Sequence, residues 1–490
     1  MQRGTIGALV GAAWIAGLFV AAPLVGGFGI VAIAEELIRR SPGWLSTMTI
    51  SLLGFYAKPV LVGGVVVGIV GTTALAAVVW PQRAEFVTHG ALIVGVVATA
   101  IVFFAVGTNL SLGLFAGLVV AVAPPYLVAR TLVGETASTD RRRFLRRVGS
   151  VAAVGIISLG GLRLLFDRFA GRRESDRVRA PLERAVWIPD GDPAFDFEGM
   201  PAAVTPPGEH YVVDINVRPP VINPETWTLD IDGAVEHPYT LTYDELLNHE
   251  ASFGQTTTMI CISNRIGGEL IGTGHWTGVQ LSDLVNAADP TDDAVNVVTH
   301  AADGYSEAIP IDLVEREDIL VVYGMGERTL ATEHGFPARL IIPGRYGMKM
   351  TKWIDRIEIA DTEHEAYWEA RGWDEEAIVN TMSYIRGAER KGDRVVIGGV
   401  AFAGLETGVE EIAAVEVSTD GGETWHEAEL ESQLDVHAWR RWRYALEAPN
   451  QSEFKVVARA IKHDGTVQTS EESSPRPSGA TGWHRKTVRV

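Results

Sequence analysis

Hydrophobic and polar residues alternate very differently in the two parts of this 490-residue chain. In the first 170 residues the apolar positions form long runs, many of them near the ~20 residues that a helix needs to cross ~30 Å of hydrocarbon. We therefore predict an N-terminal transmembrane helical bundle over residues 1–170. Buried core helices of a soluble protein are the alternative. The five predicted spans are 5–33, 59–80, 88–107, 110–130 and 149–166.

After residue 170 the apolar positions come in short groups separated by turn residues. Residues 171–202 are polar and have no clear period, so we interpret them as a linker. Residues 203–375, here called the central domain, mix short strands with short helices such as LTYDELLNHE and VQLSDLVNAA, each opening on a Thr or Ser N-cap. Residues 382–490 read as closely spaced alternating strands, which predicts an immunoglobulin-like β-sandwich. The predicted fold class is thus a helical bundle, an α+β domain and a sandwich.

Charge separates the same two parts. Residues 1–170 hold 13 Lys and Arg against 6 Asp and Glu, whereas the rest holds 29 against 55. The excess of carboxylates after residue 170 argues against a nucleic-acid partner, because phosphates would be repelled. It also suggests a halophile, as a hypothesis that folding in dilute buffer would contradict.

The cationic loop between the fourth and fifth predicted spans indicates the orientation in the bilayer. It includes Arg130 and a run of arginines from 141 to 147, and loops rich in arginine favour the cytoplasmic side. We therefore expect a multi-pass protein of the cell membrane whose part after about residue 167 is extracytoplasmic. Residues 141–146 also resemble a twin-arginine export motif, with ordinary positive-inside charge as the alternative.

Cys261 is the single cysteine of the chain, so it cannot form an internal disulfide. It follows the β-prone run 256–260 and precedes a loop that contains Gly267, Gly268, Gly272 and Gly274. Glycines allow close approach of the backbone to a bulky ligand, and a thiolate suits a soft or redox-active metal. A buried packing group is the alternative, since free cysteines are often buried.

Several long segments, in order, resemble the sulfite oxidase family of molybdopterin enzymes, including its periplasmic methionine sulfoxide reductase branch. They are PETWTLDIDGAVEHPYTLTYDELL, CISNRIGGELIGTGHWTGVQLSDLV, HGFPARLIIPGRYGMKMTKWI, STDGGETWHEAEL and GATGWHRKTVRV, within residues 203–490. The resemblance implies a sulfite-oxidase-type central domain and a dimerisation-type sandwich. It also implies a molybdenum cofactor bound through molybdopterin, with Cys261 as the protein thiolate on the metal.

The same resemblance implies a set of site residues. Cys261, Tyr305 and Arg265 would be catalytic, Tyr305 as a neutral donor facing an oxygen on the metal. The residues that would contact the cofactor, besides Cys261, are Tyr211, Asn264, His334, Arg339, Gly347, Met348, Lys349 and Lys352.

Plainer roles stay open for several of these residues. Arg339 could pair with a carboxylate, His334 could cap a turn, and Tyr305 could be a packing residue. Asn264 and Arg265 could line the pocket or fix their own loop.

The chain departs from the family pattern where sulfite oxidases carry two arginines, which align with Asp214 and Ile266 here. Losing two cations weakens the binding of a dianion such as sulfite, because a buried anion needs paired charge or donors. Arg265 or Arg218 could compensate. The chain has one cysteine, which is too few for an iron–sulfur cluster or a haem attachment motif, and residues 1–170 have one histidine, His89, which is too few for a bis-histidine haem. We therefore expect a separate electron-transfer partner.

The leading hypothesis is a membrane-anchored molybdenum oxidoreductase that transfers an oxygen atom to or from a small sulfur compound, by sulfite oxidation or sulfoxide reduction. The expected partners are the small sulfur substrate, the electron-transfer protein, the lipid bilayer and a second copy bound through the sandwich. A sensor that keeps the fold and signals through the membrane domain is the alternative. A transporter is the third, weaker hypothesis.

Overall fold

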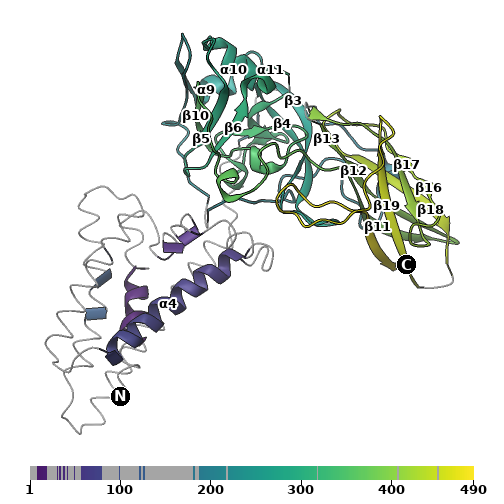
Figure 1. The fold of residues 1–490 in the computed structure, drawn as a ribbon, viewed down its shortest axis with the longest axis horizontal. Coiled ribbons are helices and arrows are strands. Elements are labelled where there is room, and N and C mark those ends of the chain that lie inside the picture. Colours follow the sequence, from purple (N-terminus) through teal and green to yellow (C-terminus); the bar gives the residue numbers. More distant parts are fainter. Residues whose placement is uncertain are drawn as a thin grey trace, which may run out of the picture. The chain divides into compact units, whose positions relative to one another are not determined.

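The structure is a computed structural model that describes residues 180–182 and 187–489, apart from short gaps at 217–218, 317, 406–407 and 450–451. Among the first 170 residues it describes mainly 8–18 and 57–79. The chain divides into two compact units, drawn with their elements in Figure 1. The first comprises Met1–Arg173 with Ile215–Val217, and the second comprises Glu174–Asp214 with Arg218–Val490.

In the first unit the structure describes the helix α4 (Ala57–Val79), which coincides with the second predicted span, 59–80. Several of its side chains lie outside the described residues. Within the described part of the chain, no helix combines the length and the apolar character needed to cross a membrane. Most of the other four predicted spans, and the twin-arginine-like residues 141–146, lie outside the described residues. The membrane domain therefore stays a prediction.

The first sheet of the central domain has the strand order β2-β1-β10-β5-β6. β1 runs parallel to β10, and the other neighbours are antiparallel. The strands are β1 (Thr228–Gly233), β2 (Tyr239–Thr242), β5 (Asn296–Ala301), β6 (Ser306–Pro310) and β10 (Ile354–Ala360).

Three short helices connect the strands of the central domain: α9 (Tyr243–Leu247), α10 (Leu281–Ala287) and α11 (Ile311–Arg316). The Thr cap predicted for the first is confirmed, because Thr242 and Glu245 form a capping box. The Ser cap predicted for the second is wrong. β4 continues directly into α10 through Gln280, which makes no side-chain cap hydrogen bond, and the buried Leu281 is already helical.

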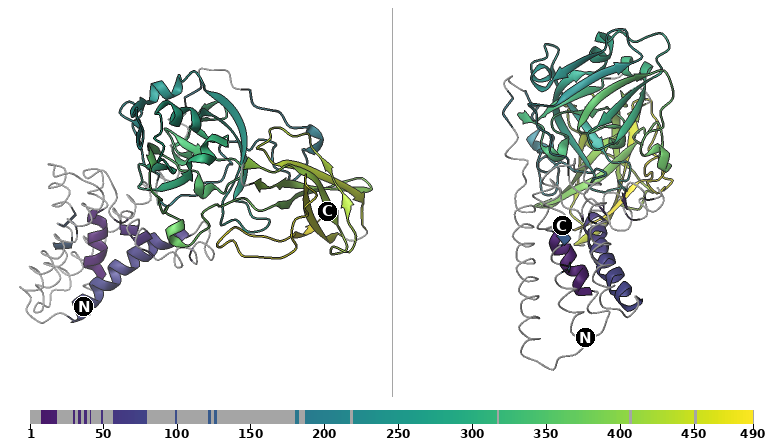
Figure 2. Two further views of the ribbon diagram at one scale, coloured as in Figure 1. Left: turned by 45° about the horizontal axis from the view of Figure 1, so that its top comes forward. Right: turned by 90° about the vertical axis from the view of Figure 1, so that its left-hand side faces the viewer.

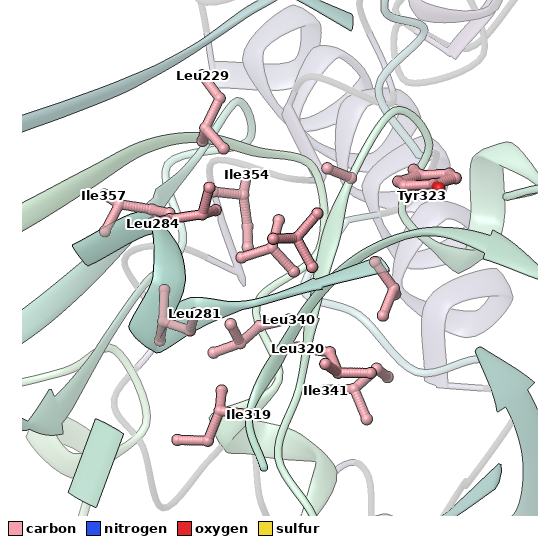
Figure 3. Packing of buried hydrophobic residues seen from close by; sticks show 14 of the residues in the cluster. Leu229, Leu281, Leu284, Ile319, Leu320, Tyr323, Leu340, Ile341, Ile354 and Ile357 are labelled. Atoms are coloured by element: carbon pink, nitrogen blue, oxygen red, sulfur yellow. The ribbon is translucent and has the colours of Figure 1, made fainter. Parts of the chain in front are cut away.

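The second sheet of the central domain presents the cysteine. It contains β3 (Phe253–Ile260), β4 (Ile271–Gln280), β7 (Leu320–Met325), β8 (Arg328–Thr329) and β9 (Arg339–Ile341). β7 is buried on both faces. Apolar side chains of both sheets and of α10 form one core, including Leu229, Leu281, Leu320, Leu340 and Ile354 (Figure 3). Because this core fixes β3 and β4, it also fixes the two ends of the loop that carries Cys261.

The C-terminal part forms two four-stranded sheets around a shared apolar core, as the alternating pattern predicts. One sheet has the order β11-β12-β18-β17 and the other β16-β15-β19-β20. The strands are β11 (Met382–Lys391), β12 (Arg394–Phe402), β15 (Ile412–Ser418), β16 (His426–Glu427), β17 (Glu429–Leu430), β18 (Arg440–Glu447), β19 (Glu453–Lys462) and β20 (His484–Arg489). A small hairpin of β13 (Gly404–Leu405) and β14 (Gly408–Val409) lies apart from both sheets.

The central domain and the sandwich lie side by side in the second unit (Figure 2). A separate core cluster joins them. Ile260 and Ile262, the neighbours of Cys261, belong to this cluster together with Tyr384 and Phe402 of the sandwich. The sandwich therefore packs directly against the segment that presents the cysteine.

Candidate active site

Cys261 begins the loop between β3 and β4 and is buried. Its amide donates to the Leu270 carbonyl at 3.0 Å, and its carbonyl accepts from the Asn264 amide at 2.9 Å, so the loop closes on both sides of it. The sulfur shares a 3.0 Å hydrogen bond with the Ser263 hydroxyl. Burial raises the pKa of the Cys261 thiol, so a thiolate there needs a strong positive partner such as a metal ion.

The side chain of Asn264 fixes the loop that follows Cys261. Asn264 Oδ1 accepts from the Leu270 amide at 3.2 Å, and a Cβ at Gly268 would lie only 2.3 Å from that oxygen. Of the two readings left open for Asn264, the geometry supports the one in which it fixes the loop. Arg265 is exposed on the same loop, whereas Ile266 is half-buried against the interdomain cluster. Arg265 is therefore not one of the buried residues near Cys261.

The sandwich also holds this loop, which the sequence pattern did not reveal. Arg386 of β11 donates to the carbonyls of Gly267 at 3.1 Å and Gly268 at 2.7 Å. Gly267 has a φ of +73°, and a Cβ there would lie 2.2 Å from the His484 ring. These contacts join residues more than 100 positions apart, so no local pattern could have predicted them.

Arg339, at the start of β9, is a buried cation. Its guanidinium donates to the His334 carbonyl at 3.1 Å and lies 5.3 Å from the centre of the Trp276 ring. Among the described residues, no ion pair joins Arg339 to a carboxylate, so the carboxylate reading considered for it finds no support. Burial lowers the pKa of Arg339 to about 10. A buried, unpaired cation is costly, which makes this a suitable place for an external anion.

Aromatic and imidazole side chains surround Arg339. The His210 ring lies 5.2 Å from Tyr211 and 5.8 Å from both Trp276 and His334. His334 donates from Nε2 to the Pro207 carbonyl at 2.9 Å. Burial lowers the pKa of His210 to about 4 and that of His334 well below its usual value, so both rings are neutral at neutral pH.

Two buried polar atoms of this group have no hydrogen-bond partner within the described part of the chain: His210 Nε2 and the Tyr211 hydroxyl. Both face glycines. A Cβ at Gly272 would lie 2.9 Å from the His210 ring, and one at Gly347 would lie 2.8 Å from the Tyr211 oxygen. Buried polar groups are normally paired, so the Tyr211 hydroxyl is available to a polar ligand. The donor set fits a pterin with a phosphate.

Lys349 has a different environment from the one predicted for a phosphate contact. Its ammonium lies 2.7 Å from a Glu307 oxygen and 2.8 Å from a Glu369 oxygen, and all three side chains are largely buried. Tyr305, next to this group, donates its hydroxyl toward Glu307 Oε2 at 3.0 Å and the Met348 carbonyl at 2.5 Å. Two carboxylates already neutralise the charge of Lys349. Sequence reasoning missed Glu307, although a carboxylate among the apolar positions of a predicted strand was a usable signal.

Lys352 pairs with Asp214, which the resemblance aligns with an arginine of sulfite oxidases. Its ammonium lies 3.2 Å from Asp214 Oδ2, 3.0 Å from the Glu333 carbonyl and 4.4 Å from the centre of the Trp353 ring. The pair carries no net charge, whereas the resemblance leads one to expect a cation there. Arg218, considered as a substitute, lies outside the described residues.

The turn η4 (Gly347–Lys349) connects the two sides of the site. On one side a Cβ at Gly347 would approach the Tyr211 hydroxyl and, at 3.5 Å, the Ile260 carbonyl that precedes Cys261. On the other side Met348 accepts from Tyr305, and Lys349 pairs with Glu307. Tyr211, Tyr305 and the residue before Cys261 therefore meet at this turn, and the region around it offers a soft metal ligand, an anion site and a neutral donor.

Two family models match the second unit. The oxidoreductase molybdopterin binding domain matches residues 216–368, and the Mo-co oxidoreductase dimerisation domain matches residues 377–490. Both fall in the part of the chain that contains the site and the sandwich.

Individual relatives agree with these models. The mitochondrial sulfite oxidases of Drosophila melanogaster and Homo sapiens are 28% and 26% identical over 58% and 55% of this chain. An NAD(P)H nitrate reductase of Hordeum vulgare is 27% identical over 46% of this chain and 32% of its own length. The matches cover 59% of the length of the sulfite oxidases.

The sulfane dehydrogenase SoxCD from Paracoccus pantotrophus shares the fold, with a TM-score of 0.53 over 64% of this chain and 89% of that chain, at 23% identity. The matches to sulfite oxidases and nitrate reductases support an oxidoreductase and imply a molybdopterin-bound molybdenum cofactor.

Proposed function

The chain carries the molybdopterin-binding and dimerisation domains of the sulfite oxidase family, and from this premise we propose that it transfers an oxygen atom to or from a small sulfur compound. The cofactor, when bound, supplies the two-electron oxygen-atom chemistry. The protein binds the cofactor, orients it and supplies the electrostatics around it. The substrate and the direction of the reaction belong to the proposal.

Each group of site residues has a role in this proposal. Cys261 provides the thiolate for molybdenum, whose positive charge would overcome the raised pKa of the buried thiol. Arg339 binds the phosphate of the pterin. Tyr211 offers the pterin its hydroxyl. Tyr305 holds a neutral hydroxyl between Glu307 and the Met348 carbonyl, because burial raises its pKa well above the usual value.

The single observation that carries the proposal is the buried guanidinium of Arg339. It contacts backbone carbonyls and an indole, with no carboxylate partner among the described residues. Burying a cation this way is unfavourable unless an anion completes the site. Gly347, which lies beside Tyr211, connects this anion site to Ile260, the last residue of β3 and the neighbour of Cys261.

The environment of Asp214 bears on the substrate. Sulfite carries two negative charges and needs cations or donors when it leaves water. The Asp214–Lys352 pair is neutral where an arginine would add a positive charge. We therefore favour a neutral acceptor such as a sulfoxide over sulfite.

Location and partners complete the proposal. The apolar runs and the arginine-rich loop of residues 1–170 support a membrane anchor with the catalytic part outside the cytoplasm. The match to a dimerisation domain supports a homodimer through the sandwich. The electron-transfer partner would be a separate protein. A sensor that binds the cofactor without turnover is the alternative.

The experiment expresses the full chain in a host that makes the molybdenum cofactor. The purified protein should contain molybdenum and pterin, and it should turn over sulfoxides or sulfite with artificial electron carriers. Cys261→Ser should lose turnover, whereas Ser263→Ala should keep the metal because the thiol remains. Wild-type protein without molybdenum would contradict the proposal, and loaded protein inactive on sulfite, sulfoxides and N-oxides would favour the sensor.

A further inference from the structure

A buried carboxyl group lies directly behind Tyr305. Glu307 is 0% exposed and lies in β6, two residues after Tyr305, which directly precedes that strand. Its Oε2 faces the Tyr305 hydroxyl at 3.0 Å. The proposed function does not use this carboxyl group, although it touches the residue predicted to face the reacting oxygen.

The two oxygens of Glu307 have different partners. Oε1 accepts from the Lys349 ammonium at 2.7 Å and from the Ala308 amide at 3.1 Å. Oε2 accepts from the Tyr305 hydroxyl at 3.0 Å, and a side-chain hydrogen bond with Glu369 also raises the pKa of Glu307. Because two donors already occupy Oε1, a proton on Oε2 lies between the carboxyl group and Tyr305.

The charges around Glu307 favour such a proton. Glu307 and Glu369 share the single ammonium of Lys349, so the buried group has one negative charge in excess when both carboxylates are ionised. Burial raises the pKa of Glu307 to about 7, and Glu369 adds to the rise while Lys349 opposes it. Glu307 therefore gains or loses a proton close to neutral pH.

Protonation reverses a hydrogen bond. With Glu307 ionised, the Tyr305 hydroxyl donates to Oε2 or to the Met348 carbonyl. With Glu307 protonated, Oε2–H donates to the Tyr305 oxygen, and the Tyr305 proton is free of the carboxyl group. Tyr305 can then give up its own hydroxyl proton and take the proton of Glu307 in its place.

We propose that Glu307 is a positioning residue that stores a proton behind Tyr305. The Tyr305 O–H bond breaks as its proton forms an O–H bond on the oxygen atom that is released as water. The Glu307 Oε2–H bond breaks as that proton forms a new O–H bond at Tyr305. One proton leaves Glu307 overall, and no electron moves. The role rests on the proposed function, because removal of an oxygen atom as water consumes protons and its insertion from water releases them.

Other titratable groups face this pair. Lys349 on η4 and Glu369 on η5 (Glu369–Arg371) contact Glu307 or its partner. Asp303 accepts from the Tyr305 amide at 3.0 Å and raises the pKa of Tyr305 further. The Tyr367 ring packs 5.5 Å from the Tyr305 ring. Glu369 also hydrogen-bonds Glu307, and Tyr305 is the group whose hydroxyl lies against Oε2.

The test is an infrared titration of the full chain, which detects a protonated carboxylic acid directly and does not depend on the cofactor. A carboxylic acid band should vanish as the pH rises through about 7, and it should be absent in Glu307→Gln. Tyr305→Phe should keep the band but shift its frequency, because the hydroxyl that receives the hydrogen bond is gone. Glu369→Gln should move the transition to lower pH, because it removes a neighbouring negative charge.

Activity gives a second readout. Glu307→Gln should lower kcat roughly tenfold and remove the pH dependence of kcat near neutrality. The loss is smaller than that expected for a group that touches the reacting atoms. Glu315→Gln, an exposed substitution in the same domain, should change neither readout.

The inference fails if the acid band is missing in the wild-type protein, or if Tyr305→Phe leaves its frequency unchanged. Tyr305→Phe and Glu369→Gln keep the test decisive if Glu307→Gln does not fold. Protein without molybdenum would contradict the proposed function alone, because the titration can still be read.

Discussion

Arg339 and Lys349 are two cations ten positions apart, and both are 4% exposed. The family pattern assigns both to the same phosphate. Lys349 lies between the carboxylates of Glu307 and Glu369. Arg339 instead contacts carbonyl oxygens and the Trp276 ring. Equal burial thus accompanies opposite electrostatic environments.

The difference identifies which cation serves the protein and which serves a ligand. A buried ion pair is satisfied within the fold, and its loss destabilises the fold. A buried cation without a carboxylate makes the fold less stable until an anion arrives. We therefore expect Lys349 to control stability and proton affinity, and Arg339 to control retention of the cofactor.

Lys349→Met should give the largest effect. It leaves Glu307 and Glu369 buried without their cation, which should cost about 3–5 kcal/mol of unfolding free energy. Urea unfolding at about pH 8, where Glu307 is ionised, measures it. Lys391→Met, at a side chain that is 51% exposed, is the matched control and should stay within about 0.5 kcal/mol. If Lys349→Met lost as little unfolding free energy as Lys391→Met, the ion pairs of Lys349 would not stabilise the fold, and the contrast with Arg339 would be wrong.

Arg339→Met should act mainly on the cofactor. Losing charged hydrogen bonds to the phosphate should weaken cofactor binding roughly 100-fold, while cofactor-free protein loses less stability than Lys349→Met does. Phosphorus and pterin content after dialysis measures retention, and urea unfolding measures stability. Arg390→Met, exposed on the sandwich, should retain the cofactor fully. Full retention by Arg339→Met would show that the phosphate lies elsewhere.

Glu307→Gln should change how stability depends on pH. Burial raises the pKa of Glu307 from 4.5 to about 7, so between these values the folded state binds more protons than the unfolded state. Its contribution to stability is then largest below about 4.5 and falls as the pH rises toward 7. The unfolding free energy of wild type minus that of Glu307→Gln should therefore decline by up to about 3 kcal/mol from pH 5 to 8. Parallel curves would contradict the raised pKa.

Asp214→Asn should have the smallest effect. Lys352 has one carboxylate partner and also contacts a carbonyl and an aromatic ring, so its environment is intermediate between those of Lys349 and Arg339. The amide keeps a hydrogen-bond acceptor, and Lys352 keeps the Glu333 carbonyl and the Trp353 ring. We expect a loss of about 1–2 kcal/mol in urea unfolding. Glu333→Gln, which leaves that carbonyl in place, should be nearly neutral. A loss as large as that of Lys349→Met would class Lys352 with the internally paired cations.

Local patterns in the sequence predicted the strands of the sandwich and the cap at Thr242. They failed at α10, where β4 runs straight into the helix through Gln280 and no cap is needed. The cap at Thr242 depends on contacts between residues three positions apart, which a local sequence pattern can predict. The start of α10 depends on the preceding strand as well, which the pattern did not take into account.

The site depends on contacts that are distant in sequence. Lys349 and Arg339 look alike in the sequence, because the carboxylate that distinguishes them belongs to Glu307 on another strand. Arg386 holds the Cys261 loop from 119 positions away. Such pairings come from tertiary packing, so the sequence indicated which residues gather but not which of them are already paired.

X-ray absorption at the molybdenum edge tests the central claim most directly, because it counts the sulfur neighbours of the metal in wild-type protein and in Cys261→Ser. The account predicts one sulfur fewer around molybdenum in the variant, or loss of the metal altogether. An identical molybdenum environment in both proteins would show that the Cys261 thiolate is not a ligand.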